Sequence, residues 1–324
     1  MSAQISIFVV NYNTRDLLRG CLHSVFENCG DSEITVFVAD NNSDDGSAEM
    51  MGEVFPEVYV VRHRNNLGFT RAINRLLPMG QGEYFLILHP DMELTAGTLR
   101  SLVAFLEAHP KAGIVGGNLY YPDGSPNPCE ILLPGFSSDL LCFAFRLFRK
   151  LREGVDLPPV HNPLEWDHKS AVRVNWVWNA CMMVRRQVFE KIGFFDERFF
   201  VWYADWDLCR RAFEAGWSTH YVPSATAIHR ERQSFSNAYM TRKEVRYKLD
   251  GWFSAPRQIE DRHVFLRKHV SWGSVLGAKI IYVLENSLRL LHVLGKVALG
   301  KSRPHETSYQ LKACLETIQS IIKA

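Results

Sequence analysis

The chain has 324 residues, enough for about two domains or for one large α/β domain with an extension. Hydrophobic residues make up 47% and charged residues 22%, which excludes a disordered chain, a collagen-like fibre and a coiled-coil rod. The 37 basic and 35 acidic side chains leave a net charge of +2, so a nucleic-acid partner, which calls for a clear basic excess, is not expected.

Seven cysteines are scattered along the chain, and none forms a CxxC pair. This usage predicts free thiols in a reducing compartment and argues against a structural zinc site. The first residues lack the basic segment and the cleavage site of a signal peptide, so a cytoplasmic location is expected.

The first third of the chain alternates apolar β-branched runs with apolar residues at helical spacing. Strands are predicted over 5–10, 33–39, 58–62 and 83–88, and helices over 16–26, 47–54 and 70–77. A further helix is predicted from Thr95, as its N-cap, to about residue 108. The alternation predicts an α/β fold with a mostly parallel central sheet flanked by helices.

Polar clusters follow three of these strands, at 11–13, 40–42 and 89–91. Because ligands of open α/β sheets bind at the carboxyl ends of the strands, the clusters predict a nucleotide-binding crevice. Neither a GxGxxG nor a Walker A sequence follows the first strand, which disfavours a dehydrogenase and a P-loop enzyme.

The second half of the chain is more irregular. Turns are predicted over 118–133, strands over 175–184 and 220–228, and helices from 185 to 192, from Asp205 to Gly216 as C-cap, and over most of the chain after 233.

Two stretches, 140–152 and 273–299, combine apolar and basic residues. Charged and polar residues interrupt the second at short intervals, so it contains no apolar run long enough to span a membrane. Each is expected to be an amphipathic helix that packs either on a protein core or on an anionic membrane surface.

Two groups of acids and one histidine are candidates for chemistry. Asp91 and Glu93 follow a buried strand, where carboxylates hold Mg²⁺ or Mn²⁺ beside substrate phosphates; the alternative is a solvated acidic turn. Asp205 and Asp207 follow an aromatic run. One of them is a candidate general base in a partly dry pocket; the alternative is that both are ordinary acids at a helix N-terminus. His229 ends a strand and is a candidate third metal ligand or diphosphate contact.

Six collinear motifs between about residues 4 and 236 resemble those of glycosyltransferase family 2, and more narrowly its bacterial rhamnosyltransferase-like group. They read VVNYN, VADNNSDDGS, NNLGFTRAIN, LILHPDMEL, NACMMVRRQVFEKIGFFDERFFVWYADWDLCRR and AGWSTHYVPSATAIHRERQS. The resemblance implies a GT-A fold, with a Rossmann-like nucleotide half and an acceptor half in one domain. It assigns 1–236 to this domain and leaves 237–324 as a helical C-terminal extension.

The resemblance also implies roles for single residues. Asp91 matches the last acid of the DxD-like metal motif, with His89 where the group often has Asn. Asp205 matches the base of the Glu-Asp motif, with Ala204 in place of the Glu, and Asp207 is the second candidate. The residues implied at the donor and acceptor are Asn11, Asn13, Asp40, Asn42, Asn66, Gly68, Phe69, Asn74, Trp178 and Asn179.

The implied activity is an inverting, Mg²⁺- or Mn²⁺-assisted transfer of a sugar from a dTDP- or UDP-sugar to a growing glycan or lipid-linked acceptor. An enzyme of this kind would lie in the cytoplasm, with peripheral contact at the inner face of the cell membrane as one interpretation of the amphipathic stretches. Two alternatives compete with this activity. A sugar nucleotidyltransferase would need a Gly-rich basic loop after the first strand to hold a triphosphate, and the sequence has none there. A degenerate transferase that only binds nucleotide sugar or glycan is supported by Ala204 and His89.

Overall fold

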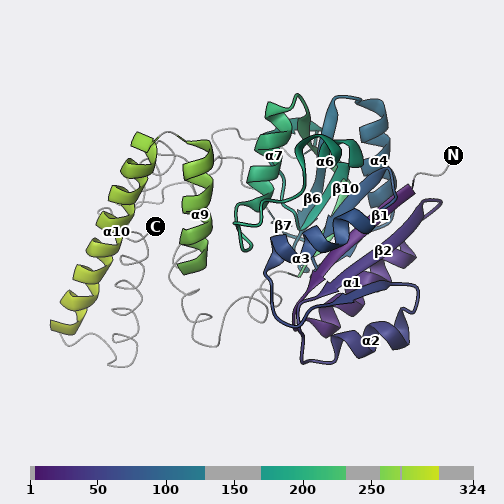
Figure 1. Cartoon of the computed structure of the whole chain (residues 1–324), viewed down its shortest axis with the longest axis horizontal. Helices are drawn as coiled ribbons and strands as arrows, with labels where there is room; N and C mark the ends of the chain where they lie inside the picture. Colours follow the sequence, from purple (N-terminus) through teal and green to yellow (C-terminus); the bar gives the residue numbers. More distant parts are fainter. Residues whose placement is uncertain (1–3, 128–168, 231–255, 271, 299–324) are drawn as a thin grey trace. The chain divides into compact units, whose positions relative to one another are not determined.

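The computed structural model describes residues 4–127, 169–230, 256–270 and 272–298. The chain forms two compact units, Met1–Ile131 with Leu164–Thr241 and Leu132–Pro163 with Arg242–Ala324 (Figure 1). The predicted helix over 140–152 and the predicted boundary at residue 236 lie outside the described residues, so both stay predictions.

The N-terminal half of the sheet in the first unit is parallel, with strand order β3-β2-β1-β4. Its strands are β1 Gln4–Asn11, β2 Glu33–Asp40, β3 Tyr59–Arg62 and β4 Tyr84–Leu88. The helices between them are α1 Arg15–Glu27, α2 Ser47–Val54 and α3 Phe69–Leu76. A 3-10 turn, η1 Leu77–Met79, extends α3. β1 is buried from its second residue to its end, as helices cover both faces of the sheet. This half confirms the predicted alternation.

The other half of the sheet is mixed. β9 Cys181–Arg185 runs antiparallel between β4 and β6 Ala112–Tyr120, and β10 Ser218–His229 then pairs in parallel with β6. The short strands are β5 Met92–Leu94 and β8 Val172–Val174, both antiparallel to β10, and β7 Pro126–Asn127, antiparallel to β6. The α/β class with a central sheet and flanking helices is confirmed; β1–β4 and the β6–β10 pair are parallel, and the other pairings of the sheet are antiparallel.

Three local predictions differ from the structure. Helix α4 covers Thr98–Ala108 and follows Gly97 at φ +82°, because the Thr95 hydroxyl bonds to Thr226 of β10 instead of capping the helix. The strand predicted over 175–184 is β9 alone, and its first residues form an irregular segment. The turns predicted after 118 begin only beyond Tyr120, since β6 continues to that residue and pairs with β7.

Helices α6 Arg186–Ile192 and α7 Ala204–Glu214 complete the described part of the first unit. Gly216 follows α7 at φ +92°, which confirms it as the residue that ends the helix in a left-handed conformation. The main core lies where β1, β2 and β4 pack against α1 and α4. The polar strand ends lie outside this core.

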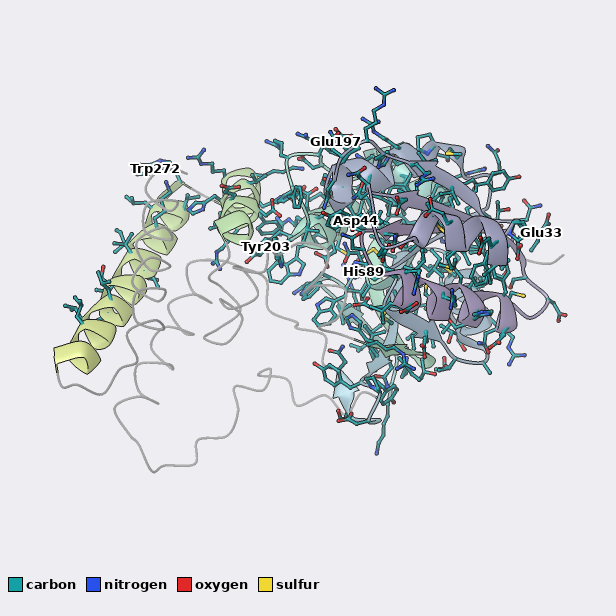
Figure 2. The ribbon with its side chains drawn as sticks, turned by 90° about the horizontal axis from the view of Figure 1, so that it is seen from below. Glu33, Asp44, His89, Glu197, Tyr203 and Trp272 are labelled. Atoms are coloured by element: carbon teal, nitrogen blue, oxygen red, sulfur yellow. The ribbon has the colours of Figure 1, made fainter. Side chains whose placement is uncertain are left out.

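The described part of the second unit consists of α9 Pro256–His269 and α10 Trp272–Ala298. Leu266 and Val275 pack together between the two helices. Trp272, at the start of α10, is 79% exposed (Figure 2). No described helix is long and apolar enough to cross a membrane.

Candidate active site

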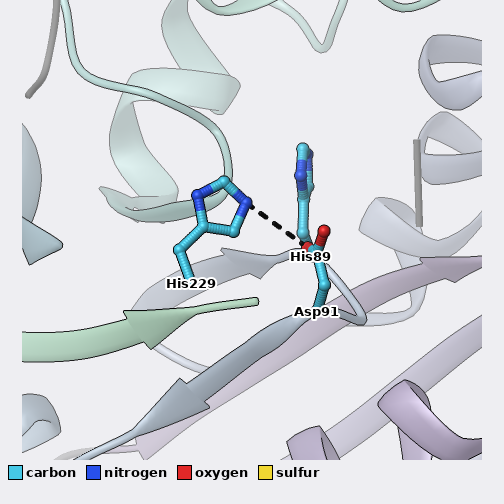
Figure 3. A group of neighbouring side chains, drawn as sticks. All are labelled: His89, Asp91 and His229. Atoms are coloured by element: carbon cyan, nitrogen blue, oxygen red, sulfur yellow. Dashed lines mark ion pairs between the residues drawn. The ribbon is translucent and has the colours of Figure 1, made fainter. Parts of the chain in front are cut away.

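Three potential metal ligands meet where β4 and β10 end (Figure 3). His89 and Asp91 follow β4, and His229 is the last residue of β10, opposite Met92 of β5. The ligand atoms of the three side chains lie within 4.8 Å of one another. The His229 Nε2 and Asp91 Oδ1 atoms are 3.6 Å apart, and both residues are buried.

The chemistry of this cluster fits a divalent ion. Burial lowers the pKa of His89 to about 4, although the nearby Asp91 carboxylate opposes the effect. A neutral imidazole keeps a nitrogen lone pair for a ligand, and the Asn179 side chain holds the ring by a hydrogen bond. Two imidazoles and one carboxylate are a poor match for Mg²⁺, which prefers oxygen ligands, and a better one for Mn²⁺.

Glu93, predicted as a metal ligand, lies outside this cluster. It occupies β5 opposite Ile228 and makes a double ion pair with Arg230, at 2.6 and 3.1 Å. A carboxylate held by both oxygens on a guanidinium is already satisfied. His89, a departure from the usual motif, joins the cluster instead.

Asp205, the predicted base, lies in the first turn of α7 and is 9% exposed. Burial raises the pKa of its carboxyl group to about 7, against the lowering effect of hydrogen bonds from the backbone N–H groups of Trp206 and Asn179. A carboxyl group with this pKa is suited to accept a proton near neutral pH.

Asp207, the second candidate base, is fully buried and paired with Arg211 at 2.8 Å. Arg211 also donates hydrogen bonds to the carbonyl oxygens of Ile192 and Phe194. The pair therefore ties α7 to the start of the segment that leads to Asp205. The i,i+4 spacing of Asp207 and Arg211 is the sequence signal that could have predicted this pairing.

A row of aromatic rings runs from the neighbourhood of Asp205 to His229. Tyr203 contacts Trp206, and Trp206 contacts Trp176 at a centroid distance of 4.7 Å. Trp176 neighbours Trp178, whose ring meets His229 edge-on at 6.0 Å. A row of contacting aromatic rings thus links the candidate base to the metal-ligand cluster; Trp176 within it is buried, and the half-buried Trp178 and Trp206 are the rings that a sugar could reach.

Two of the predicted donor residues bond to each other at the strand ends. Asn11 donates to Asp40 Oδ1 at 3.0 Å, and Asp40 Oδ2 accepts from the Ser43 N–H. Both side chains are buried. The predicted residues Asn13 and Asn42 are less buried and have left-handed backbones, with φ of 55° and 68°. Asn11 and Asp40 therefore shape the loops at the strand ends, and the Asn13 side chain also braces its neighbouring loop by accepting from the Asp44 N–H at 2.9 Å.

The predicted 66–74 motif holds the segment 195–200, which precedes Asp205. The Asn66 side chain accepts from the Gly68 N–H, and Phe69 N–H donates to the Phe200 carbonyl. Asn74 makes two hydrogen bonds with the backbone of Phe195, at 2.7 and 3.1 Å. The motif thus positions the loop that leads to the candidate base.

Asn127 is a residue of this site that the sequence did not indicate. It lies in β7, within the predicted turns, and its side chain contacts Nδ1 of His229 at 2.8 Å. No local pattern could have found it, because 102 residues separate the two partners.

Comparison with known proteins identifies the family of the chain. The profile of the family described as Glycosyl transferase family 2 matches residues 6–193. The chain is 28% identical over 292 residues to the N-acetylglucosaminyl-diphospho-decaprenol L-rhamnosyltransferase of Mycobacterium tuberculosis, covering 83% of this chain and 86% of the relative. It is 24% identical to the rhamnosyltransferase WbbL of Escherichia coli, covering 72% and 88%.

Two solved structures share the fold. The mannosyltransferase PcManGT of Pyrobaculum calidifontis, in complex with GDP-Man and Mn²⁺, superposes with a TM-score of 0.50 at 16% identity, covering 100% of this chain and 87% of that one. TarS 1–349 of S. aureus gives a TM-score of 0.52 at 14% identity, covering 99% and 91%. The matches agree with the resemblance that the motifs indicated, including its rhamnosyltransferase-like group.

Proposed function

Because the chain belongs to glycosyl transferase family 2, we propose that it moves a sugar from a nucleotide-diphosphate donor to an acceptor hydroxyl in one inverting displacement. The observation that supports this most directly is the aromatic row that links buried Asp205 to the cluster of His89, Asp91 and His229. An inverting displacement needs a base at the attacking hydroxyl and charge stabilisation at the leaving group, and the two ends of the row offer these two functions.

In the proposed step, the carboxylate of Asp205 accepts the proton of the acceptor hydroxyl. The hydroxyl oxygen forms the new bond to the anomeric carbon while the bond from that carbon to the diphosphate oxygen breaks, and the nucleoside diphosphate leaves. A bound divalent ion supplies neutralising charge to the diphosphate. His89, Asp91 and His229 are the residues that would hold it, and their donor atoms favour Mn²⁺ over Mg²⁺.

The other predicted residues take supporting roles. Asn13 and Asn42 are proposed to face the nucleotide, and Trp178 with Asn179 to border the acceptor sugar. Asp207 is proposed as a positioning residue through Arg211. Residues 1–236 are proposed as the catalytic domain and 237–324 as a helical extension.

We propose dTDP-rhamnose as the donor, with UDP-sugars as the alternative, and a glycan on a lipid diphosphate as the acceptor. Support comes from relatives that are named as rhamnosyltransferases, one of them for a decaprenyl-diphosphate substrate. The test is a screen of nucleotide sugars for nucleotide release in the presence of a prenyl-diphospho-N-acetylglucosamine acceptor. Nucleotide release from dTDP-rhamnose is expected, and it should be at least about 100-fold slower in Asp205→Asn. Nucleotide-sugar binding without any release would instead favour the degenerate binding protein.

We propose that α10 rests on the inner face of the cell membrane. One stripe of its exposed side chains is apolar, at spacings of three and four residues: Leu276, Ile280, Leu284, Leu288 and Leu291. Such a stripe can enter the boundary between lipid head groups and acyl chains. Co-sedimentation of the full chain with phosphatidylglycerol vesicles should fall in the double variant Leu284→Glu/Leu288→Glu. The control Phe213→Glu, another exposed apolar residue, should bind like the wild type; equal binding of all three would contradict the proposal.

A further inference from the structure

The contact between Asn127 and His229 allows two hydrogen-bond arrangements. Asn127 is 4% exposed, and its Nδ2 lies 2.8 Å from His229 Nδ1. Its Oδ1 is buried and has no hydrogen-bond partner among the described residues. The two ends of a carboxamide have nearly the same shape, so a half turn about the Cβ–Cγ bond brings Oδ1 to the position of Nδ2.

The two arrangements select different tautomers of a neutral His229. When Asn127 Nδ2 donates, His229 Nδ1 carries the lone pair and its proton sits on Nε2, facing Asp91. When Asn127 Oδ1 accepts, the proton sits on Nδ1 and the Nε2 lone pair faces the cluster. Only the second tautomer can ligate an ion together with Asp91, because a nitrogen that bears a proton cannot coordinate.

The surroundings of His229 leave this choice to Asn127. Within the described residues, the His229 ring makes its one side-chain hydrogen bond to Asn127, and the Trp178 ring covers it edge-on. The adjacent Arg230 is engaged by Glu93. Asn127 itself is held in β7, opposite Leu119 of β6, so its side chain stays within reach of the imidazole.

We propose that Asn127 is a positioning residue that sets the tautomer of His229, donating to Nδ1 in the ion-free protein and accepting from Nδ1–H when a divalent ion is bound. The inference rests on the proposed metal-assisted transfer and deepens it. It adds a residue that touches neither substrate nor metal, and whose amide turns as the ion binds.

Two variants of the full chain test it. Asn127→Leu keeps the size of the side chain and removes both arrangements, whereas Asn127→Asp keeps only the acceptor. Binding of Mn²⁺, measured without substrate by the electron paramagnetic resonance of the free ion, should weaken about 10- to 100-fold in the Leu variant. The Asp variant should bind at least as tightly as the wild type. Asn28→Leu, which removes hydrogen bonds to two backbone carbonyls and does not contact His229, is the matched control and should bind normally.

¹⁵N NMR of the His229 ring reads the tautomer in the wild-type protein itself, and the folded variant His229→Gln, which lacks this ring, assigns the signals. Addition of diamagnetic Zn²⁺ should move the ring proton from Nε2 to Nδ1. An unprotonated Nδ1 in the metal-bound protein, or equal weakening in the Asp and Leu variants, would overturn the inference. Either of these outcomes would leave the role of Asp205 as the base untouched. Conversely, sugar transfer that persists in excess chelator would overturn the proposed role of the metal in transfer, but it would not change the tautomer of His229 measured by NMR.

Discussion

Replacement of Asp205 by Asn separates a catalytic carboxylate from a structural one. The buried carboxyl has its pKa raised from the ordinary 3.8 to about 7, and the Trp206 N–H that donates to its Oδ1 would also serve an amide oxygen. The substitution therefore keeps the shape of the side chain and this hydrogen bond, and removes its charge and its basicity. Transfer should fall about 10²- to 10⁴-fold, the usual contribution of a general base, while donor binding persists.

The same pKa predicts how stability depends on pH. Between about pH 4 and pH 7 the folded protein holds a proton on Asp205 that the unfolded chain has lost, so this contribution to stability is present at low pH and is lost as the pH rises through 7. A displacement of about three pH units corresponds to roughly 4 kcal/mol, of which about 3 kcal/mol falls between pH 5 and pH 8. The wild type should lose this amount relative to Asp205→Asn, which has no group to titrate there.

The assay pairs urea unfolding at pH 5 and pH 8 with the pH profile of kcat, which should rise through about pH 7 as the carboxylate forms. Asp207→Asn is the matched control on the same helix. It breaks the buried pair with Arg211 and should destabilise the protein by about 3 kcal/mol at both pH values. If Asp205→Asn turned over normally, or if its stability followed pH as the wild type does, the reasoning about Asp205 would be refuted.

Three further predictions concern the loop that leads to the base and the ion. Gly68→Ala places a Cβ 2.6 Å from the Phe200 ring at φ +79° and should lower the free energy of unfolding in urea by at least about 2 kcal/mol. The control Gly124→Ala has the same φ but open space around the Cβ, and it should lower the free energy of unfolding by about 1 kcal/mol. Equal losses in the two variants would contradict the role of the Phe200 contact. Asn74→Leu removes two hydrogen bonds to the Phe195 backbone and should lower the free energy of unfolding by about 3 kcal/mol. The variant should also lose more in kcat than in donor affinity. An unchanged kcat in the folded variant would count against the proposal that Asn74 positions the loop before Asp205. Excess EDTA should stop nucleotide release, and Mn²⁺ should restore it at lower concentration than Mg²⁺; full activity in EDTA would remove the ion from the mechanism.

The sequence by itself determined the fold class and the family, and it predicted a candidate site at the strand ends. In the sequence, apolar runs of strand length alternate with segments of helical periodicity. This pattern matches the structure because helices cover both faces of the parallel half of the sheet, so its strands must be apolar along their length. The polar residues after β1, β2 and β4 lie at strand ends in the structure, as parallel pairing requires. The motif order indicated glycosyltransferase family 2 and a glycosyltransferase activity, and both are confirmed by the family match.

Only the tertiary structure decided which side chains meet. Glu93 is two residues from Asp91, yet it lies in β5 beside β10 and therefore forms an ion pair with Arg230. His89 lies beside His229 in the metal-ligand cluster, although the two residues are far apart in the sequence. Asn127 reaches His229 through the pairing of β7 with β6, next to β10. Strand periodicity reports which residues are buried, but partners across a mixed sheet depend on register and strand order, which arise from contacts between residues distant in sequence.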